Sequence, residues 1–90
     1  MSDETQVALL RGHVRKGRSW AQCLLGQWHL AGQLGVRQSP VMAAKLFEKA
    51  AAQGHAQAQY NLGVLYRDGD GVHRSPEEAA RLWKKGAAQG

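Results

Sequence analysis

A repeat of 36 to 37 residues is the feature that most constrains how this 90-residue chain can fold. The pair Ser39-Pro40 recurs 36 residues later as Ser75-Pro76, whereas upstream of these pairs the spacing is 37. The one-residue difference falls in the predicted loop Gly32-Gln33-Leu34-Gly35, where an insertion leaves the flanking elements in register. The identical pairs include Ala21 and Ala58, Leu25 and Leu62, Gly26 and Gly63, Ala43 and Ala79, Leu46 and Leu82, and Gln53 and Gln89. Self-similarity at this period is typical of a stacked repeat architecture.

The second copy begins with a predicted helix near Ala56. Apolar residues at positions 58, 62, 65 and 66 follow the i, i+4, i+7, i+8 stripe of an amphipathic helix. Gly69 and Gly71 then supply the left-handed or tight backbone conformations that end it. Gly63, inside this helix, matches Gly26 of the first copy, although Gly within a helix costs about 1 kcal/mol relative to Ala. Its recurrence predicts a close backbone approach between paired helices.

The second helix of this copy starts with a three-part signal. Ser75 is a side-chain cap, Pro76 takes the first helical position, and Glu78 follows the serine by three residues, as in a capping box. We expect this helix to end at Gly90, the counterpart of Gly54.

The predicted architecture is an all-α solenoid of five helices in a single domain, residues 1–90. Its parts are a leading helix at 5–17, a first repeat at 18–54 with helices at 19–31 and 39–53, and a second repeat at 55–90. The leading helix places Leu9 and Leu10 where Leu46 and Phe47 fall one period later. We therefore expect it to take the role of a preceding second helix.

The second copy resembles the Sel-one-like repeat, a solenoid relative of the tetratricopeptide repeat. The matching segments are Ala56-Gln57-Ala58-Gln59-Tyr60-Asn61-Leu62-Gly63-Val64-Leu65-Tyr66, Gly69-Asp70-Gly71-Val72, Ala79-Ala80-Arg81-Leu82-Trp83 and Ala87-Ala88-Gln89-Gly90. The first copy departs from the pattern at Trp20, Cys23, Trp28 and His29. The resemblance implies a protein–protein adaptor or scaffold, often bacterial, with no chemistry of its own. The disulfide-bonded branch of that family carries paired cysteines, which this chain lacks.

Composition indicates the cellular compartment in which the protein is expected. The chain has 12 Lys and Arg against 7 Asp and Glu, a net charge of +5. Its start lacks the basic and apolar regions of a signal peptide, and no apolar run reaches the length of a membrane span. The single Cys23 cannot form an internal disulfide, so nothing requires an oxidising compartment. We expect a cytoplasmic protein without a membrane partner.

A basic patch lies near the start of the chain, formed by Arg11, Arg15, Lys16 and Arg18. Such a patch favours acidic partners or nucleic acid through long-range attraction, and it is also typical of a solvated helix face. It lacks the interleaved aromatic residues that single-strand binders usually have. Nucleic-acid or acidic-polymer binding is therefore the alternative function, not the first.

No constellation predicts catalysis, a metal or a cofactor. Asp68-Gly69-Asp70-Gly71 resembles part of a calcium loop, but the liganding fifth and twelfth positions fall on Val72 and Ala79. The four histidines show no metal-ligand spacing. His29 matches Tyr66, which predicts a half-buried structural role. We expect a protein that is not an enzyme.

The family resemblance implies that the first helix of each hairpin lines a concave face. The outward positions predicted to bind a partner there are Trp20, Cys23, Gln27, Leu30, Gln57, Tyr60, Val64 and Arg67. Trp20 matches the polar Gln57, so it either packs on the leading helix or is exposed as a binding anchor, a role in which Trp is enriched. The predicted function is an adaptor or regulatory module that binds a peptide or helix of another protein.

The last helix predicts self-association. It carries the apolar set Ala79, Leu82, Trp83 and Ala87, whose counterparts pack internally in the first repeat. Part of the set should contact its own hairpin partner and part should face a missing neighbour, which favours a homodimer through this face. Two alternatives remain: the stems of Arg81, Lys84 and Lys85 cover the set, or the natural chain is longer.

Overall fold

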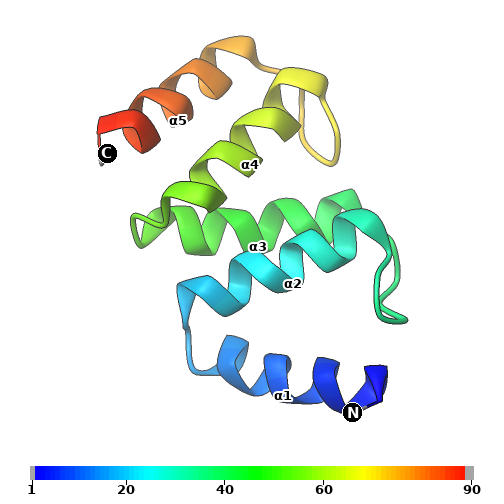
Figure 1. Ribbon diagram of the computed structural model, residues 1–90. Helices are drawn as coiled ribbons and strands as arrows, with labels where there is room; N and C mark the ends of the chain where they lie inside the picture. The colour runs from blue at the N-terminus through cyan, green and yellow to red at the C-terminus, as the bar shows by residue number, and fades with distance from the viewer. Residues whose placement is uncertain (1, 89–90) are drawn as a thin grey trace.

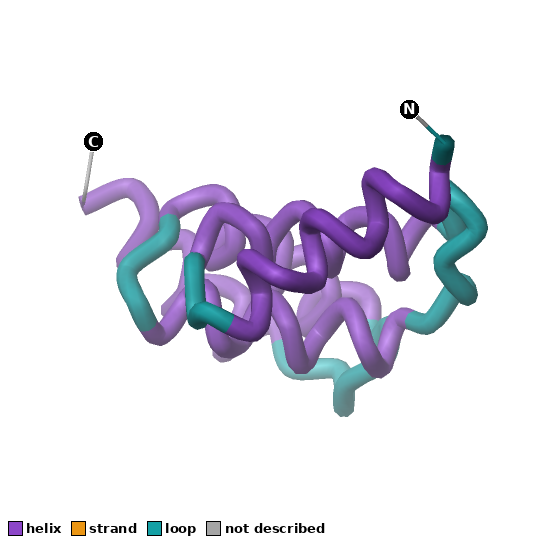
Figure 2. Tube along the Cα trace, turned by 90° about the horizontal axis from the view of Figure 1, so that it is seen from below, coloured by secondary structure: helices purple, strands orange, loops and turns teal. Residues whose placement is uncertain are grey.

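The computed structural model describes residues 2–88 and contains, within them, five α-helices and no strand. The helices are α1 (Asp3–Arg15), α2 (Ser19–Ala31), α3 (Pro40–Ala52), α4 (Ala56–Asp68) and α5 (Pro76–Ala88). They stack in chain order from α1 at one end to α5 at the other, in a body of 40 × 24 × 17 Å (Figure 1). The loops are confined to the ends of the helices (Figure 2). The predicted all-α architecture is confirmed.

The predicted helix boundaries depend on caps that the structure confirms. The hydroxyl oxygens of Ser39 and Ser75 each accept a hydrogen bond, at 3.2 Å, from the backbone N–H three residues on. Gly32 and Gly69 end α2 and α4 in the left-handed conformation, with φ of 70° and 68°. The predicted end at Gly90 lies outside the described residues.

The capping box expected at α5 is only half formed. The Glu78 carboxylate pairs with Arg81 on its own helix instead of returning to the cap. The backbone N–H of Ser75 donates to the carbonyl oxygen of Tyr66 at 2.8 Å, and Ser39 donates in the same way to His29 at 2.7 Å. This N–H therefore ties the start of each second helix to the first helix of its own hairpin.

Within each hairpin, an aromatic ring packs directly against a glycine of the partner helix. A Cβ atom at Gly26 would lie 2.6 Å from Cε1 of Phe47, and one at Gly63 would lie 2.8 Å from Cδ1 of Trp83. Real Cβ atoms do not approach other heavy atoms so closely. The close approach predicted from the recurring glycines is confirmed, with the ring of the second helix as the group that requires it.

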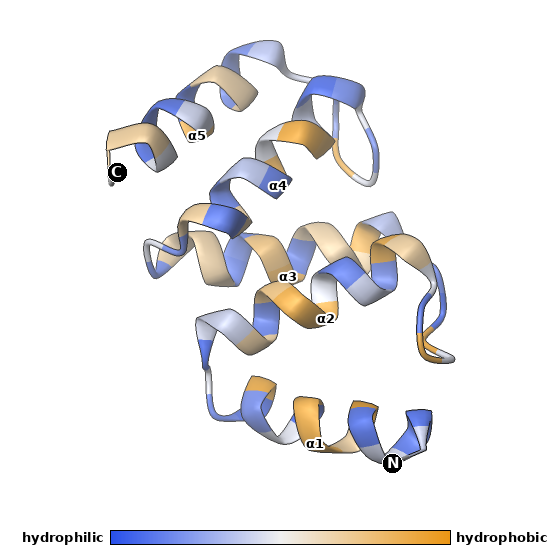
Figure 3. Cartoon of the chain, in the orientation of Figure 1, coloured by the Kyte–Doolittle hydropathy of each residue, from blue (hydrophilic) through white to orange (hydrophobic). Residues whose placement is uncertain are grey.

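Two apolar clusters form the core. The larger joins α2, α3, α4 and α5 through Cys23, Ala43, Ala44, Phe47, Ala50, Ala58, Leu62, Leu65 and Leu82. The smaller attaches α1 to the first hairpin through Leu10, Ala21, Leu25, Val36 and Leu46. Apolar and polar stretches alternate along the helices, and none is uniformly apolar (Figure 3). Each helix therefore stabilises the fold by burying one side against its neighbours.

The leading helix only partly fills the role of a preceding second helix. Leu10 is 5% exposed and belongs to the core, as the repeat predicts, but Leu9 is 55% exposed. The counterpart of Leu9 is Leu46, which packs with Leu25 of its own hairpin partner. Among the described residues no helix is paired with α1 in that way, so the prediction is wrong for Leu9.

Three buried polar side chains have hydrogen-bond partners. Gln22 Oε1 accepts a bond of 2.9 Å from Nε2 of Gln53, which also donates to the carbonyl oxygen of Gly17 at 3.0 Å. Gln59 Nε2 donates to the carbonyl oxygen of Ala51 at 3.3 Å. His29 is 6% exposed, with Nδ1 2.9 Å from the carbonyl oxygen of Arg37. This position agrees with the structural role predicted for His29, although the side chain is buried and not half-buried as predicted.

The ring-on-glycine contact predicts that Gly26→Ala destabilises the protein although it improves helix propensity. The new methyl group would displace Phe47 from a fully packed site, and overpacking of this kind costs about 1–3 kcal/mol. Gly12→Ala is the matched control, because the heavy atom nearest to its Cβ would be the mobile end of Arg15 at 3.9 Å. We expect this control to raise stability by up to about 1 kcal/mol. Urea unfolding followed by circular dichroism measures both; equal stabilisation by the two changes would contradict the contact.

Candidate protein-interaction site

The residues predicted to face a partner come in four pairs related by the repeat. The pairs are Trp20 with Gln57, Cys23 with Tyr60, Gln27 with Val64, and Leu30 with Arg67. The members on α4 are exposed, apart from the partly buried Val64, whereas those on α2 range from exposed to fully buried. Position in the repeat alone therefore does not decide which of these residues a partner can reach.

Cys23 is the clearest correction. It is 3% exposed and lies in the larger core cluster, where Nδ2 of Asn61 on α4 is 3.8 Å from its sulfur. Burial raises the pKa of the Cys23 thiol, and the Asn61 contact lowers it in part. Its counterpart Tyr60 is 55% exposed, because no described helix of a following repeat contacts it as Asn61 of α4 contacts Cys23. Cys23 is therefore a packing residue and not part of a binding surface.

Leu30 and Gln27 are less accessible than predicted. Leu30 is partly buried and packs against the larger core cluster, so only part of its side chain is accessible to a partner. Gln27 and its counterpart Val64 are also partly buried. The exposed part of the predicted surface consists of Trp20, Gln57, Tyr60 and Arg67.

Tyr60, Arg67 and Trp83 form one group, which we call the end cluster; Tyr60 and Arg67 are exposed and Trp83 is partly buried. The rings of Tyr60 and Trp83 are stacked, with centroids 6.1 Å apart and an interplanar angle of 30°. The Arg67 guanidinium carbon lies 6.0 Å from the centre of the Trp83 ring. Nε1 of Trp83 donates to the backbone oxygen of Tyr60 at 3.2 Å, so the ring is fixed in position.

The guanidinium of the end cluster is held from its other side. Arg67 donates two hydrogen bonds, of 2.8 and 3.2 Å, to the carboxylate of Asp68. This pairing lowers the pKa of the Asp68 carboxyl and raises that of Arg67. The end cluster thus presents two aromatic rings and an oriented cation to solvent, a combination enriched at protein-binding hot spots.

Trp20 both packs on the leading helix and stays exposed, and its role as a binding anchor stays a prediction. Its ring centroid lies 5.0 Å from that of His13 on α1, and His13 in turn contacts the guanidinium of Arg18. Even so, Trp20 remains 49% exposed. These three residues lie where the chain turns from α1 into α2.

The face predicted to self-associate is mostly internal. Ala79 and Leu82 are 1% and 4% exposed, and Leu82 packs in the larger core cluster, so neither residue is available to a second copy. Trp83 is partly buried against Gly63, and Ala87 is exposed. The sequence pattern places Trp83 in this face and does not associate it with Tyr60. The available signal is the change from Phe47 to Trp83 at one repeat position.

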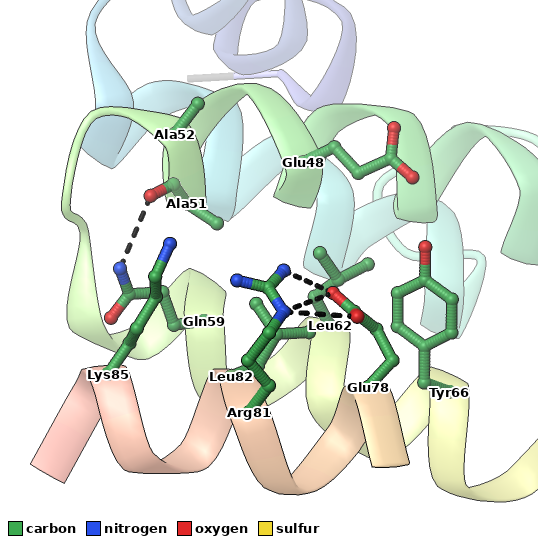
Figure 4. Close-up of a pocket in the computed structure, with 10 residues that line it drawn as sticks. All are labelled: Glu48, Ala51, Ala52, Gln59, Leu62, Tyr66, Glu78, Arg81, Leu82 and Lys85. Carbon is green, nitrogen blue, oxygen red and sulfur yellow. Dashed lines mark hydrogen bonds and ion pairs between the residues drawn. The ribbon is translucent and has the colours of Figure 1, made fainter. Parts of the chain in front are cut away.

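A groove of about 280 Å³ lies between α3 and α5, with α4 as its floor (Figure 4). Its lining residues are Glu48, Ala51, Ala52, Gln59, Leu62, Tyr66, Glu78, Arg81, Leu82 and Lys85. Burial raises the pKa of the Tyr66 phenol, and the carboxylates of Glu48 and Glu78 raise it further. Pairing with Arg81 lowers the pKa of the Glu78 carboxyl. The charges of this groove thus balance one another within the chain.

The described part of the chain contains no group of three or more His, Cys, Asp and Glu side chains placed to hold a metal ion. None of its helices combines the length and apolar character needed to cross a membrane.

These features define a helical-hairpin solenoid whose exposed surfaces are suited to contact other macromolecules. A family model for the Sel1 repeat matches residues 21–55 and 56–90, and the chain therefore belongs to the Sel1 repeat family. Proteins of this family generally mediate protein–protein interaction, and the fold is typically a non-catalytic scaffold. No curated protein matches the chain significantly.

Two solved structures are similar over 93% of this chain, each with a TM-score of 0.90. One is a Sel1 repeat protein from Oxalobacter formigenes, 38% identical, and the other is c5321, a protective antigen of uropathogenic Escherichia coli with an SLR fold, 34% identical. The chain spans 63% of the first protein and 18% of the second.

The burial of Cys23 predicts a protected thiol. We expect it to react with iodoacetamide at pH 8 at least tenfold more slowly in the folded chain than in urea, because the thiolate is disfavoured and the sulfur is covered. The raised pKa also means that stability is full at neutral pH and declines as pH rises through the ordinary thiol pKa of about 8.5. Equal alkylation rates in the two states, measured by mass spectrometry, would place Cys23 on the surface after all.

Proposed function

We propose that this chain is a non-catalytic binding module that takes a peptide or helix of another protein on the exposed side of its first helices. The end cluster is the observation that carries this function. It joins two aromatic rings and a guanidinium that the fold itself fixes in place. Rigid aromatic and arginine side chains contribute more binding energy per residue than mobile ones, since little entropy is lost when they are covered.

The predicted concave surface extends the site beyond the end cluster. Gln57 lies three residues before Tyr60 and hence on the same side of α4, where its side chain donates to Asn61 at 2.9 Å. Trp20 occupies the position on α2 that Gln57 occupies on α4. A bound segment that follows the stacking direction would therefore contact Trp20, Gln57 and Tyr60 in turn. Side-chain amides between aromatic anchors fix the register of such a segment through hydrogen bonds.

The two other sequence-based expectations stay predictions. Nucleic-acid binding by Arg11, Arg15, Lys16 and Arg18 would show itself as a steep loss of affinity with rising salt. For a homodimer through the last helix, Ala79 and Leu82 are excluded because they are buried. Trp83 and Ala87 are the residues of that face that could still contact a second copy. A bacterial cytoplasmic location also stays a prediction.

Selection of peptides on the immobilised protein from a display library tests the binding function. Tyr60→Ala and Trp20→Ala should each weaken the selected peptides by about 1 kcal/mol or more, measured by titration calorimetry. Tyr60→Ala keeps the hydrogen bond from Trp83, which goes to the backbone oxygen, so the scaffold is preserved. Glu77→Ala changes an exposed residue in the first turn of α5, outside the proposed site. It is the control and should leave affinity unaltered. Peptides that bind all three variants as tightly as the wild type would refute this site.

Light scattering tests the homodimer separately. We expect the mass to rise towards that of two chains as the protein concentration increases through the micromolar range, and Trp83→Leu to reduce this association. A monomeric mass throughout that range would remove the prediction.

A further inference from the structure

The repeat predicts a counterpart of the α3–α5 groove one repeat earlier, between α1 and α3. The repeat relates its lining residues as follows: Glu48 to Arg11, Ala52 to Arg15, Glu78 to Met42, Arg81 to Lys45, and Lys85 to Lys49. The floor is equivalent too, because Leu62 corresponds to Leu25 and Tyr66 to His29. We call this counterpart the basic groove.

The packing of the helices supports this correspondence. Leu10 of α1 and Leu46 of α3 lie in one core cluster with Leu25 of α2. In the same manner, Ala50 of α3 and Leu82 of α5 share a cluster with Leu62 of α4. In both repeats two second-type helices thus flank a first helix, and the channel seen between α3 and α5 is expected between α1 and α3 as well.

The two grooves differ in charge. In the groove of Figure 4, Arg81 is paired with Glu78, and Glu48 adds a second carboxylate. In the basic groove Arg11 and Met42 take the positions of these two acids. The four cations Arg11, Arg15, Lys45 and Lys49 are all exposed, and no acidic residue stands at any of the equivalent lining positions. The ion pairs found among residues 2–88 are Arg67–Asp68 and Arg81–Glu78, and neither involves these four.

A cavity of about 570 Å³ lies between α1 and the loop that follows α2. Arg11 and His29 line this cavity and also hold positions of the basic groove. The lining of the cavity includes the apolar residues Val7, Ala8, Leu34 and Val36 and the charged residues Asp3, Glu4 and Arg37. The volume lies within the range of ligand-binding pockets.

We propose that the basic groove binds an acidic peptide segment of another protein, with its carboxylates on the four cations and an apolar side chain in the adjoining cavity. Charge complementarity selects the occupant, since four exposed cations with no acid among the equivalent groove positions attract a polyanion and disfavour a basic one. The apolar cavity favours a peptide over nucleic acid, because none of the lining residues is an aromatic platform on which bases stack. This surface lies on different helix faces from the end cluster, and the inference does not rest on the function proposed for that cluster.

A synthetic rhodamine-labelled peptide, in which glutamates flank two leucines, is the probe, and fluorescence anisotropy is the measurement. Lys45→Gln with Lys49→Gln should weaken its binding by roughly tenfold at low salt, through the loss of two complementary charges. Arg74→Gln with Lys84→Gln removes the same charge from exposed positions outside the groove and should change affinity less than twofold. A glutamine version of the peptide should bind weakly to every variant, and Leu34→Ser should weaken the acidic peptide without changing its salt dependence.

Other outcomes distinguish the alternatives. Equal losses in the groove variant and in the charge-matched variant would reduce the interaction to non-specific attraction by net charge and overturn the proposal. A single-stranded oligonucleotide that displaces the peptide at lower concentration, with the same dependence on Lys45 and Lys49, would reassign the groove to nucleic acid. Tyr60→Ala should leave this binding intact, so failure here is separable from failure of the end cluster. Thermal unfolding of each variant confirms that it is folded.

Discussion

Contact between an aromatic ring and a glycine backbone is the constraint on which each hairpin depends. Gly26 and Gly63 allow Phe47 and Trp83 to lie directly against the partner helix, at distances that a methyl group would forbid. Close packing brings the remaining small residues of the interface into contact, and alanines predominate in the larger core cluster. The dispersion energy gained over such an interface offsets the helix propensity lost at the two glycines.

Helix positions could be predicted from the sequence because the signals are local. A serine cap followed by proline starts α3 and α5, and a left-handed glycine ends α2 and α4. These signals act within a few residues, so they are readable without knowledge of neighbours. The capping box predicted at Ser75 is only half formed, because the backbone N–H of Ser75 donates to the carbonyl oxygen of Tyr66 on another helix.

Exposure at the candidate site could be predicted only in part, because it depends on which helix lies alongside. Cys23 and Tyr60 occupy one repeat position, yet α4 contacts the former and no described helix of a following repeat contacts the latter. Leu9 and Leu46 differ for the same reason at the other end. Trp20 was identified because it departs from the repeat, whereas Trp83 conforms to it, and its association with Tyr60 and Arg67 required the three-dimensional arrangement.

The loops after α2 and α4 differ in length, and this difference changes the space beside the loop without changing the adjoining helices. In the shorter loop, Gly71 packs against the backbone of Pro40 and Val41. The longer loop instead places Leu34, with φ of 56°, on the wall of an open cavity. Neither arrangement alters the length or the capping of the adjoining helices. Loop length therefore changes the ligand-sized space that a repeat offers while the helices on either side keep their length.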